Sequence, residues 1–467
     1  MDRIYSPVYR GNNDPGNLAD SISPDSTGTV WMIHLKKGLR FQDDPCFPDG
    51  VGEEVTAHDV QFSWRRGMGP PYWVAPIVKH LDRVHVLNSH VLQVTLKHPN
   101  WRFIDELGRE EFLIVSRRAV EYYGDDFRHH PVGSGPFKLA ELKPGEIVLA
   151  RNENYWVTDE FGQRLPYLDT IVFQFEPDPV SRYRKLLEEE FDVISLGQIN
   201  SPTIVSHTLT RTLDQGDKRD FSFTLIDTLE KEGYKLLEGN IVWLLHCPID
   251  RELRTNKYLC QALNWAIERE KIQMKGLCAN AIQAGGPLIK SLNPEFEKYG
   301  YDHQKAKSLM VKAGYPEGEG FPTLMFSTTP ASLPVYQEIQ KDLSAIGIKT
   351  DFTVESQLQS SAYSNFRNTG FTLYTAWDNP MDQLLPYNSK YYLHIDNSVF
   401  DSLYALAEKE PMEERRKVLF KQMEELILGK PPAVFLFWFK SFYLANKRVM
   451  NLKPERFGVW EGTWIKK

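Results

Sequence analysis

The sequence predicts an α/β protein built as two or three domains or as one large two-lobed body. Three observations support this class. The 467 residues exceed the size of one ordinary domain. Strand patterns with turns dominate the first third, whereas helical patterns alternate with strand patterns from Asp250 onward. Finally, residues 323–354 have the order strand, helix, strand of a βαβ unit, which predicts a pair of parallel strands.

Two strands and one helix are predicted near the N-terminus. Hydrophobic residues alternate in residues 29–41 and again in residues 90–100, as they do in strands that bury one face. Between them, residues 56–68 predict a helix. Thr56 can cap it, Asp59 stands three residues later as in a capping box, and apolar residues recur at four-residue spacing.

A hairpin and a second helix follow. Residues 133–156 predict a hairpin that turns at residues 143–145, because proline and glycine favour a tight turn between two strand-forming runs. Residues 181–194 predict a helix capped by Ser181. The weak pattern of residues 200–235 predicts no element.

Longer helices are predicted after Asp250. Residues 256–272 form one apolar helical face, and residues 301–313 form another helix, which the following glycine and proline end. The helix of the βαβ unit has an apolar face made by Val335, Ile339, Leu343 and Ile346. The apolar run 431–439 is too short to cross a bilayer and predicts a buried strand.

The composition is typical of a globular protein without a nucleic-acid or membrane partner. Hydrophobic residues make up 42% of the chain and charged residues 25%, and the net charge of -7 is spread over interspersed acidic and basic residues. This distribution lacks a basic surface for nucleic acid or anionic lipid. The first twenty residues hold no basic segment followed by an apolar one, so no signal peptide is predicted. Either the protein stays in the cytoplasm or a leader lies outside the given chain.

No motif predicts catalytic residues, a metal or a cofactor. The chain lacks a nucleophile elbow, a zinc-protease helix and a phosphate-binding loop, and residues 132–137 (VGSGPF) predict a tight turn. His129 and His130 are adjacent on a segment expected to be extended, where neighbouring side chains point to opposite faces. The cysteines form no CxxC pair and are expected to be buried as small apolar residues, with one disulfide as the alternative: Cys46, Cys247, Cys260 and Cys278.

A strand that ends in polar residues gives the candidate ligand site. Residues 371–377 alternate as a strand and end at Trp377, and Asp378 and Asn379 begin a turn at Pro380. In open α/β sheets, ligands bind just outside the carboxyl ends of the strands. An aspartate beside an indole suits an ammonium group, which the ring face attracts by about 1 kcal/mol. The alternative is ordinary turn chemistry, in which the aspartate binds nearby backbone N–H groups.

Several segments, taken in order, resemble the bacterial extracellular solute-binding proteins of family 5, the dipeptide- and oligopeptide-binding proteins of ABC importers. They cover most of the chain from Thr29 onward. The matching segments are HLKKGLRFQDDPCFPDG, TAHDVQFSWRR, PVGSGPFKL, LARNENYW, LPYLDTIVF, QALNWAIEREKI, YDHQKAKSLMVKAGYP and IGIKTDF. No single segment is diagnostic, whereas the ordered set is specific.

The resemblance implies a periplasmic-binding-protein-like fold, α/β with mixed sheets, whose two lobes close on a ligand in the cleft between them. It places lobe I at residues 1–248, lobe II at residues 249–435, and a return to lobe I at residues 436–467. It also implies binding without chemistry. A monomer would bind a peptide or a similar small solute and hand it to ABC permease subunits, in the periplasm or at the cell surface.

The same resemblance gives Asp378 a role. In peptide-binding relatives, an aspartate after a tryptophan near the end of such a strand pairs with the free amino terminus of the peptide. Trp377, Asp378 and Asn379 are therefore the predicted ligand-binding residues. The family usually has two residues between the tryptophan and the aspartate, whereas Asp378 follows Trp377 directly, so a shorter turn is expected here.

Two other functions remain as alternatives. A leaderless relative could have lost transport and act as an intracellular binder or chaperone, which fractionation of the native protein would reveal. A hydrolase would need two carboxylates roughly 5–10 Å apart across a cleft. Turnover of a peptide or glycoside panel would separate that function from binding alone.

Overall fold

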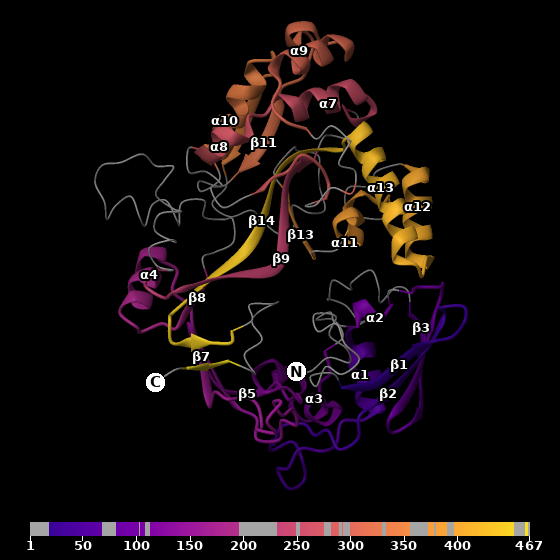
Figure 1. The fold of residues 1–467 in the computed structure, drawn as a ribbon, viewed down its shortest axis with the longest axis vertical. Coiled ribbons are helices and arrows are strands. Elements are labelled where there is room, and N and C mark those ends of the chain that lie inside the picture. The colour runs from indigo at the N-terminus through magenta and orange to yellow at the C-terminus, as the bar shows by residue number, and fades with distance from the viewer. Residues whose placement is uncertain are drawn as a thin grey trace.

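The computed structural model describes residues 18–67, 81–101, 103–107, 113–195, 231–248, 253–274, 282–288, 292, 299–328, 333–354, 372–377, 380–389, 397–452 and 463–465. Figure 1 shows an elongated molecule with a lower and an upper lobe. Two long strands, β9 (Lys235–Pro248) and β14 (Ala433–Ala445), run from one lobe into the other. Both lobes combine helices with sheets, which confirms the predicted two-lobed α/β fold.

The lower lobe is built on two antiparallel sheets with the strand orders β1-β2-β4-β3 and β5-β6-β7. One hydrophobic core joins the first sheet to α1, α2 and α3. The elements are β1 (Ala19–Pro24), β2 (Val30–Leu35), α1 (Ala57–Gly67), β3 (Leu81–Asn88), β4 (Val91–Leu96), α2 (Phe103–Glu106), α3 (Arg117–Tyr123), a 3-10 helix (Gly124–His129), β5 (Phe137–Lys143), β6 (Glu146–Arg151), β7 (Thr170–Gln174), α4 (Pro179–Leu187) and β8 (Val193–Ser195).

The strands, the first helix and the hairpin predicted for this half are confirmed, together with their local causes. The backbone N–H and the hydroxyl of Thr56 donate to the carboxylate of Asp59 at 2.9 and 2.8 Å, which closes the first turn of α1. Lys143 lies opposite Glu146, and Gly145 has a φ of 80°. The hairpin therefore turns where proline and glycine predict it.

Helix α4 begins at Pro179, earlier than predicted. Its cap is Asp178 and not Ser181, because the Asp178 carboxylate accepts the backbone N–H of Ser181 at 3.1 Å. Pro179 is favourable in the first turn, where a helix has no partner for the missing N–H. The hydroxyl of Ser181 donates instead to Glu176 at 2.9 Å. The prediction failed because two capping residues stand close together and either could begin the helix.

The upper lobe contains the predicted βαβ unit. Strands β11 and β12 are parallel, and the helix between them buries the predicted face. The elements are a 3-10 helix (Leu253–Thr255), α7 (Lys257–Ala266), α8 (Arg269–Met274), β10 (Ile282–Gln283), α9 (His303–Lys312), a 3-10 helix (Pro316–Gly318), β11 (Leu324–Thr328), α10 (Leu333–Ser344), β12 (Thr350–Val354), β13 (Thr372–Trp377), α11 (Pro380–Leu384), a 3-10 helix (Leu385–Tyr387), α12 (Ser398–Lys409) and α13 (Glu413–Gly429). After β14, β15 (Val449–Met450) and β16 (Trp464–Ile465) form a small sheet.

The single helix predicted for residues 256–272 is wrong, because the chain breaks between α7 and α8. Ile267 leaves the helical conformation, with φ -90° and ψ 120°. The side chain of Arg269 then folds back toward the end of α7. Its Nη1 donates to the carbonyl oxygens of Asn264 and Ile267, at 3.2 and 3.1 Å. Carbonyl groups left unpaired at the end of α7 are thus satisfied by a side chain.

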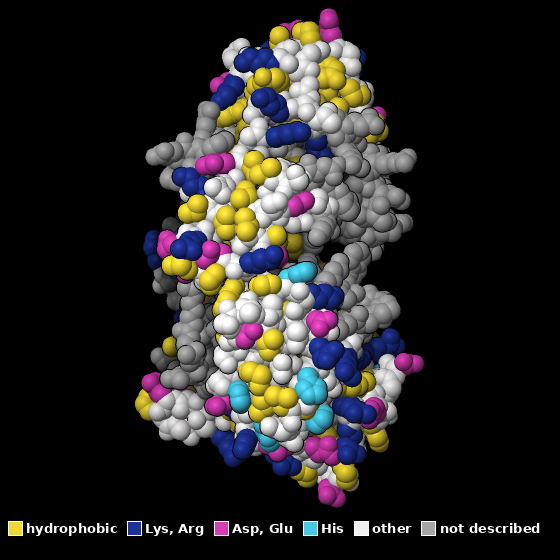
Figure 2. Space-filling view, turned by 90° about the vertical axis from the view of Figure 1, so that its right-hand side faces the viewer, with side chains coloured by type: hydrophobic (Ala, Val, Ile, Leu, Met, Phe, Trp, Pro, Cys, Tyr) yellow, Lys and Arg dark blue, Asp and Glu magenta, His cyan; other side chains and the backbone are white. Residues whose placement is uncertain are grey.

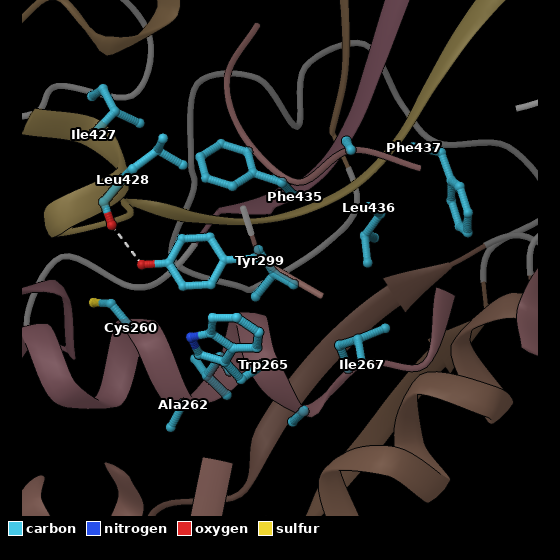
Figure 3. Close-up of a cluster of buried hydrophobic side chains, with 14 of the residues drawn as sticks. Cys260, Ala262, Trp265, Ile267, Tyr299, Ile427, Leu428, Phe435, Leu436 and Phe437 are labelled. Atoms are coloured by element: carbon cyan, nitrogen blue, oxygen red, sulfur yellow. Dashed lines mark hydrogen bonds between the residues drawn. The ribbon is translucent and has the colours of Figure 1, made fainter. Parts of the chain in front are cut away.

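Aromatic side chains fill the core between α7 and β14, as Figure 3 shows. Tyr299 lies between Trp265 on α7 and the start of β14, with its ring centroid 5.5 Å from that of Trp265. Its hydroxyl donates to the carbonyl of Leu428 at 2.5 Å. Residues 433–438 are buried, which confirms the buried strand predicted from the apolar run.

Cys46 and Cys260 are buried free thiols, as expected. Burial raises the pKa of each thiol to about 12, so both are protonated at neutral pH. The side chain of Cys247 and all of Cys278 lie outside the described residues. Figure 2 shows lysine, arginine and acidic side chains interspersed over one face, with histidines gathered on its lower half.

Candidate functional site

The two strands that connect the lobes share an interrupted ladder. In β9 and β14, Val242 lies opposite Lys440, and the next pair joins Glu238 to Phe442. Residues 239–241 of β9 therefore have no ladder partner in β14, and residue 441 of β14 has none in β9. The buried side chains of β14 up to Trp438 belong to the upper core, and Leu444 packs with residues of the lower lobe. The interruption lies between these two packed regions.

Strand β13 ends at this interruption. It pairs antiparallel with β9 from Thr372 opposite His246 to Trp377 opposite Ile241. Ile241 is one of the residues that the β9–β14 ladder skips. Strand β13 thus ends at Trp377, beside the part of β9 that lies between the two packed regions.

The three predicted ligand residues are only partly described. Trp377 is the last residue of β13, as predicted, but its side chain is outside the described part of the chain. Asp378 and Asn379 lie outside the described residues altogether. Their role as ligand residues therefore stays a prediction.

The argument that placed these residues at a parallel sheet edge is wrong. Strand β13 belongs to a sheet with the order β10-β14-β9-β13, in which each described pairing is antiparallel. The rule for the carboxyl ends of parallel strands does not apply to such a sheet. Trp377 reaches the region between the two packed parts of the molecule because β13 pairs with β9, a strand more than 120 residues earlier in the chain.

The residues after β13 anchor its end to the upper core. Helix α11 follows at once and buries Met381 and Leu384. Tyr387 comes next and is fully buried, with its ring 6.3 Å from that of Phe435. Burial raises the pKa of Tyr387, so the phenol stays neutral. The residues from Pro380 onward are therefore packed into the upper core, and packed elements position a binding site more precisely than loops do.

Two other stretches considered from the sequence have structural roles. In the VGSGPF turn, Gly133 accepts the backbone N–H of Gln42 at 2.9 Å, so the segment ties two loops together. His129 and His130 do not point to opposite faces: both contact the carboxylate of Asp126, at 2.6 and 3.2 Å. The expectation failed because the segment ends a 3-10 helix and is not extended.

Neither a metal-binding cluster nor a membrane-spanning helix is found among the described residues. None of their histidine, cysteine and acidic side chains forms a group of three or more that could hold a metal ion. None of the described helices is long and apolar enough to cross a membrane.

Comparison with known proteins places the fold and the family. A glutathione-binding protein of Pectobacterium atrosepticum is 24% identical over 90% of this chain and 79% of its own length. The haem-binding protein A of Haemophilus influenzae is 25% identical over 94% and 82%. Among solved structures, the periplasmic binding protein DppA of Helicobacter pylori, in complex with the peptide STSA, has a TM-score of 0.78 at 21% identity, covering 100% of this chain and 92% of its own.

A second solved structure agrees with this fold. The dipeptide-binding protein of Pseudoalteromonas sp. SM9913, in complex with Met-Leu, has a TM-score of 0.76 at 18% identity, covering 100% of this chain and 94% of its own. The model of the bacterial extracellular solute-binding proteins, family 5, matches residues 15–393. That match spans well over half of the 467 residues and confirms the resemblance of the ordered segments. The chain therefore belongs to the family 5 bacterial extracellular solute-binding proteins.

Proposed function

We propose that this protein binds a peptide between its lobes and delivers it to the permease subunits of an ABC importer, in the periplasm or at the cell surface. Relatives named for glutathione, and similar structures that hold STSA and Met-Leu, favour a peptide over other solutes. The relative named for haem makes haem the competing ligand. Binding, without turnover, is the activity proposed.

One observation carries this proposal: β13 ends opposite the interrupted ladder of the two connecting strands. A ligand held there would contact the upper lobe beside the part of β9 and β14 that passes from one packed region to the other. Closure of the lobes around it would be a population shift, since a ligand that contacts both lobes binds the closed state better than the open one.

The pivot of this closure is proposed at the interruption. Residues 239–241 leave the regular ladder, so fewer hydrogen bonds resist bending there than along the rest of β9. The division into residues 1–248, 249–435 and 436–467 stays a prediction. The pivot is proposed to lie inside the two strands, at residues 239–241 of β9 and residue 441 of β14, which all fall within lobe I as so divided.

A ligand panel tests the proposal. Glutathione, dipeptides, tetrapeptides and haem are added to the purified protein, and thermal unfolding is followed. A peptide present at 100 times its Kd is expected to stabilise the protein by about 2.7 kcal/mol. Stabilisation by haem and by none of the peptides would reject the peptide assignment. Release of a hydrolysed product from any panel member would reject binding as the sole activity.

Replacing Asp378 with alanine is expected to weaken binding of peptides with a free amino terminus by about 10- to 100-fold, because one hydrogen bond to a charged group is lost. N-acetylated peptides lack the ammonium group, so their affinity should not change. Titration calorimetry of both peptide forms measures the difference. The matched control is Asp351→Ala, which removes an exposed carboxylate from β12 in the same lobe. Equal losses for both peptide forms would contradict the role of Asp378.

A further inference from the structure

Strand β14 has a bulge where it packs in the upper core. Phe435 lies opposite His246 and Phe437 lies opposite Leu245, so Leu436 is an extra residue without a ladder partner in β9. Figure 3 shows Phe435, Leu436 and Phe437 along this part of the strand. A bulge of this kind bends its strand and increases the local twist. Because β14 runs on into the lower lobe, the shape of the bulge affects the direction in which the strand leaves the upper lobe.

The edge of β14 that faces away from β9 loses its neighbouring strand at this bulge. Strand β10 pairs with Phe437 and Trp438, and the N–H of Ala284 still donates to the carbonyl of Leu436 at 3.0 Å. From there back to Ala433, no described strand pairs with this edge. The backbone groups of the edge therefore need partners other than a strand.

Two side chains supply those partners. Asn264 on α7 donates from Nδ2 to the carbonyl of Ala433 at 2.9 Å and accepts the N–H of Phe435 at Oδ1, at 3.0 Å. The same Nδ2 donates to the carbonyl of Cys260 at 3.0 Å, which holds the amide against its own helix. Arg269 on α8 donates from Nε to the carbonyl of Phe435 at 2.7 Å. The amide of Asn264 thus offers β14 one donor and one acceptor, as the backbone of a neighbouring strand would.

These hydrogen bonds lie in a dry core. Asn264 and Ala433 are fully buried, and Arg269 is 3% exposed. Water cannot replace a bond that breaks there, so each separated group would stay unpaired at a cost in free energy. A buried polar network with all its members paired rigidifies the segment that it joins. The bulge is therefore held in one shape, and bending of β14 at this point is unfavourable.

We propose that Asn264 is a positioning residue for the closure of the lobes. By holding the bulge, it fixes the direction of β14 and confines bending to the interruption at residues 239–241 of β9 and residue 441 of β14. This inference rests on the closure proposed above. Without the amide of Asn264, β14 would have a second point of bending, and the unliganded protein would sample more relative orientations of its lobes. Fewer of these orientations would be competent to bind a ligand between the lobes.

The test is small-angle X-ray scattering of the unliganded full chain, with hydrogen exchange measured in parallel. Asn264→Ala removes both the donor and the acceptor. The amides of residues 433–437 are expected to exchange faster, and the distribution of interatomic distances should become broader than in the wild type. Binding of glutathione and of the dipeptide Met-Leu should weaken by about tenfold, the loss expected when about one molecule in ten is competent to bind.

The matched control is Asn152→Ala. Asn152 is 2% exposed, and its Nδ2 donates to the carbonyl of Gly135 at 2.8 Å. It directly follows β6 in the lower lobe and belongs to neither connecting strand. Its removal should lower thermal stability as the loss of a buried amide does, while the scattering profile and the ligand affinity stay as in the wild type.

Two outcomes overturn the proposal. If Asn264→Ala scatters like the wild type although residues 433–437 exchange faster, Asn264 has a structural role alone. If both variants change the scattering equally, the effect is a general loss of stability. Should Asn264→Ala fail to fold, Asn264→Asp takes its place, because it keeps the acceptor for Phe435 and loses the donor to Ala433. A wild type that closes on no ligand contradicts the proposed function, whereas the unliganded comparison still decides the role of Asn264.

Discussion

Replacing Arg269 with methionine is expected to lower the free energy of unfolding of the upper lobe by about 3–5 kcal/mol, because several buried hydrogen bonds to a charged group are lost at once. The guanidinium is fully enclosed and donates to the carbonyl oxygens of four residues: Asn264, Ile267, Gly300 and Phe435. Methionine fills much of the same volume but donates no hydrogen bond. The carbonyl of Ile267 would keep the backbone N–H of residue 269 at 3.2 Å. The other three carbonyls would lose this donor, which costs about 1–3 kcal/mol for each buried group that finds no other partner.

The charge on Arg269 is maintained by these carbonyls. Among the described residues, no carboxylate forms an ion pair with it. Burial lowers the pKa of Arg269 to about 10, and the negative charge of Asp342 opposes that shift. The group is therefore still protonated at neutral pH, and its five donors fit the carbonyl groups around it.

Hydrogen exchange of the upper lobe measures the effect of Arg269→Met. Peptides from α7, α8 and β14 should lose protection first, because Arg269 joins these elements. Lys271→Met on the same helix is the matched control. Its side chain is 40% exposed and its ammonium lies 3.5 Å from the Glu268 carboxylate, a surface pair worth at most about 1 kcal/mol. If both variants exchange at the same rate, the structural role assigned to Arg269 is wrong.

Arg269 also shows why the sequence predicts a helix but not its break. In the run Glu268 to Lys271 every residue is charged, so the pattern indicates a solvated helical turn. The structure buries one of the four completely, because its partner carbonyl on β14 lies 166 residues further along the chain. Helical periodicity is a local property, whereas this burial is decided by contact with a distant strand.

The candidate site divides in the same way. The alternation of residues 371–377 predicts a strand that ends at Trp377, and the structure confirms it. This prediction succeeds because alternating hydrophobicity is a local property of the strand's own sequence. The partner of that strand and its direction were not predicted. Both depend on β9, for which the sequence predicts no partner strand. Only the pairing of Trp377 with Ile241 brings the end of β13 to the part of β9 that lies between the two packed regions.

A second large effect is expected for Gly52→Ala in the lower lobe. A Cβ at this residue would lie 1.9 Å from the carbonyl oxygen of Phe41 and 2.8 Å from that of Gln42. The backbone cannot easily move apart, because the Gly52 N–H donates to Asp43 at 2.8 Å and the Phe41 N–H donates to Glu53 at 2.9 Å. The variant is expected to lose about 3 kcal/mol of stability through this overlap.

The neighbouring Gly50 provides the control for Gly52→Ala. It has a φ of 70° with no atom near its missing Cβ, and asparagine tolerates this left-handed conformation, so Gly50→Asn should cost less than about 1 kcal/mol. Because the lobes have separate cores, Gly52→Ala should raise hydrogen exchange in α1 and leave α10 protected. Equal exchange in the two variants would contradict the close approach to Phe41. A ligand that bridges the lobes should restore part of the lost protection in α1, since binding to the closed state stabilises both lobes at once.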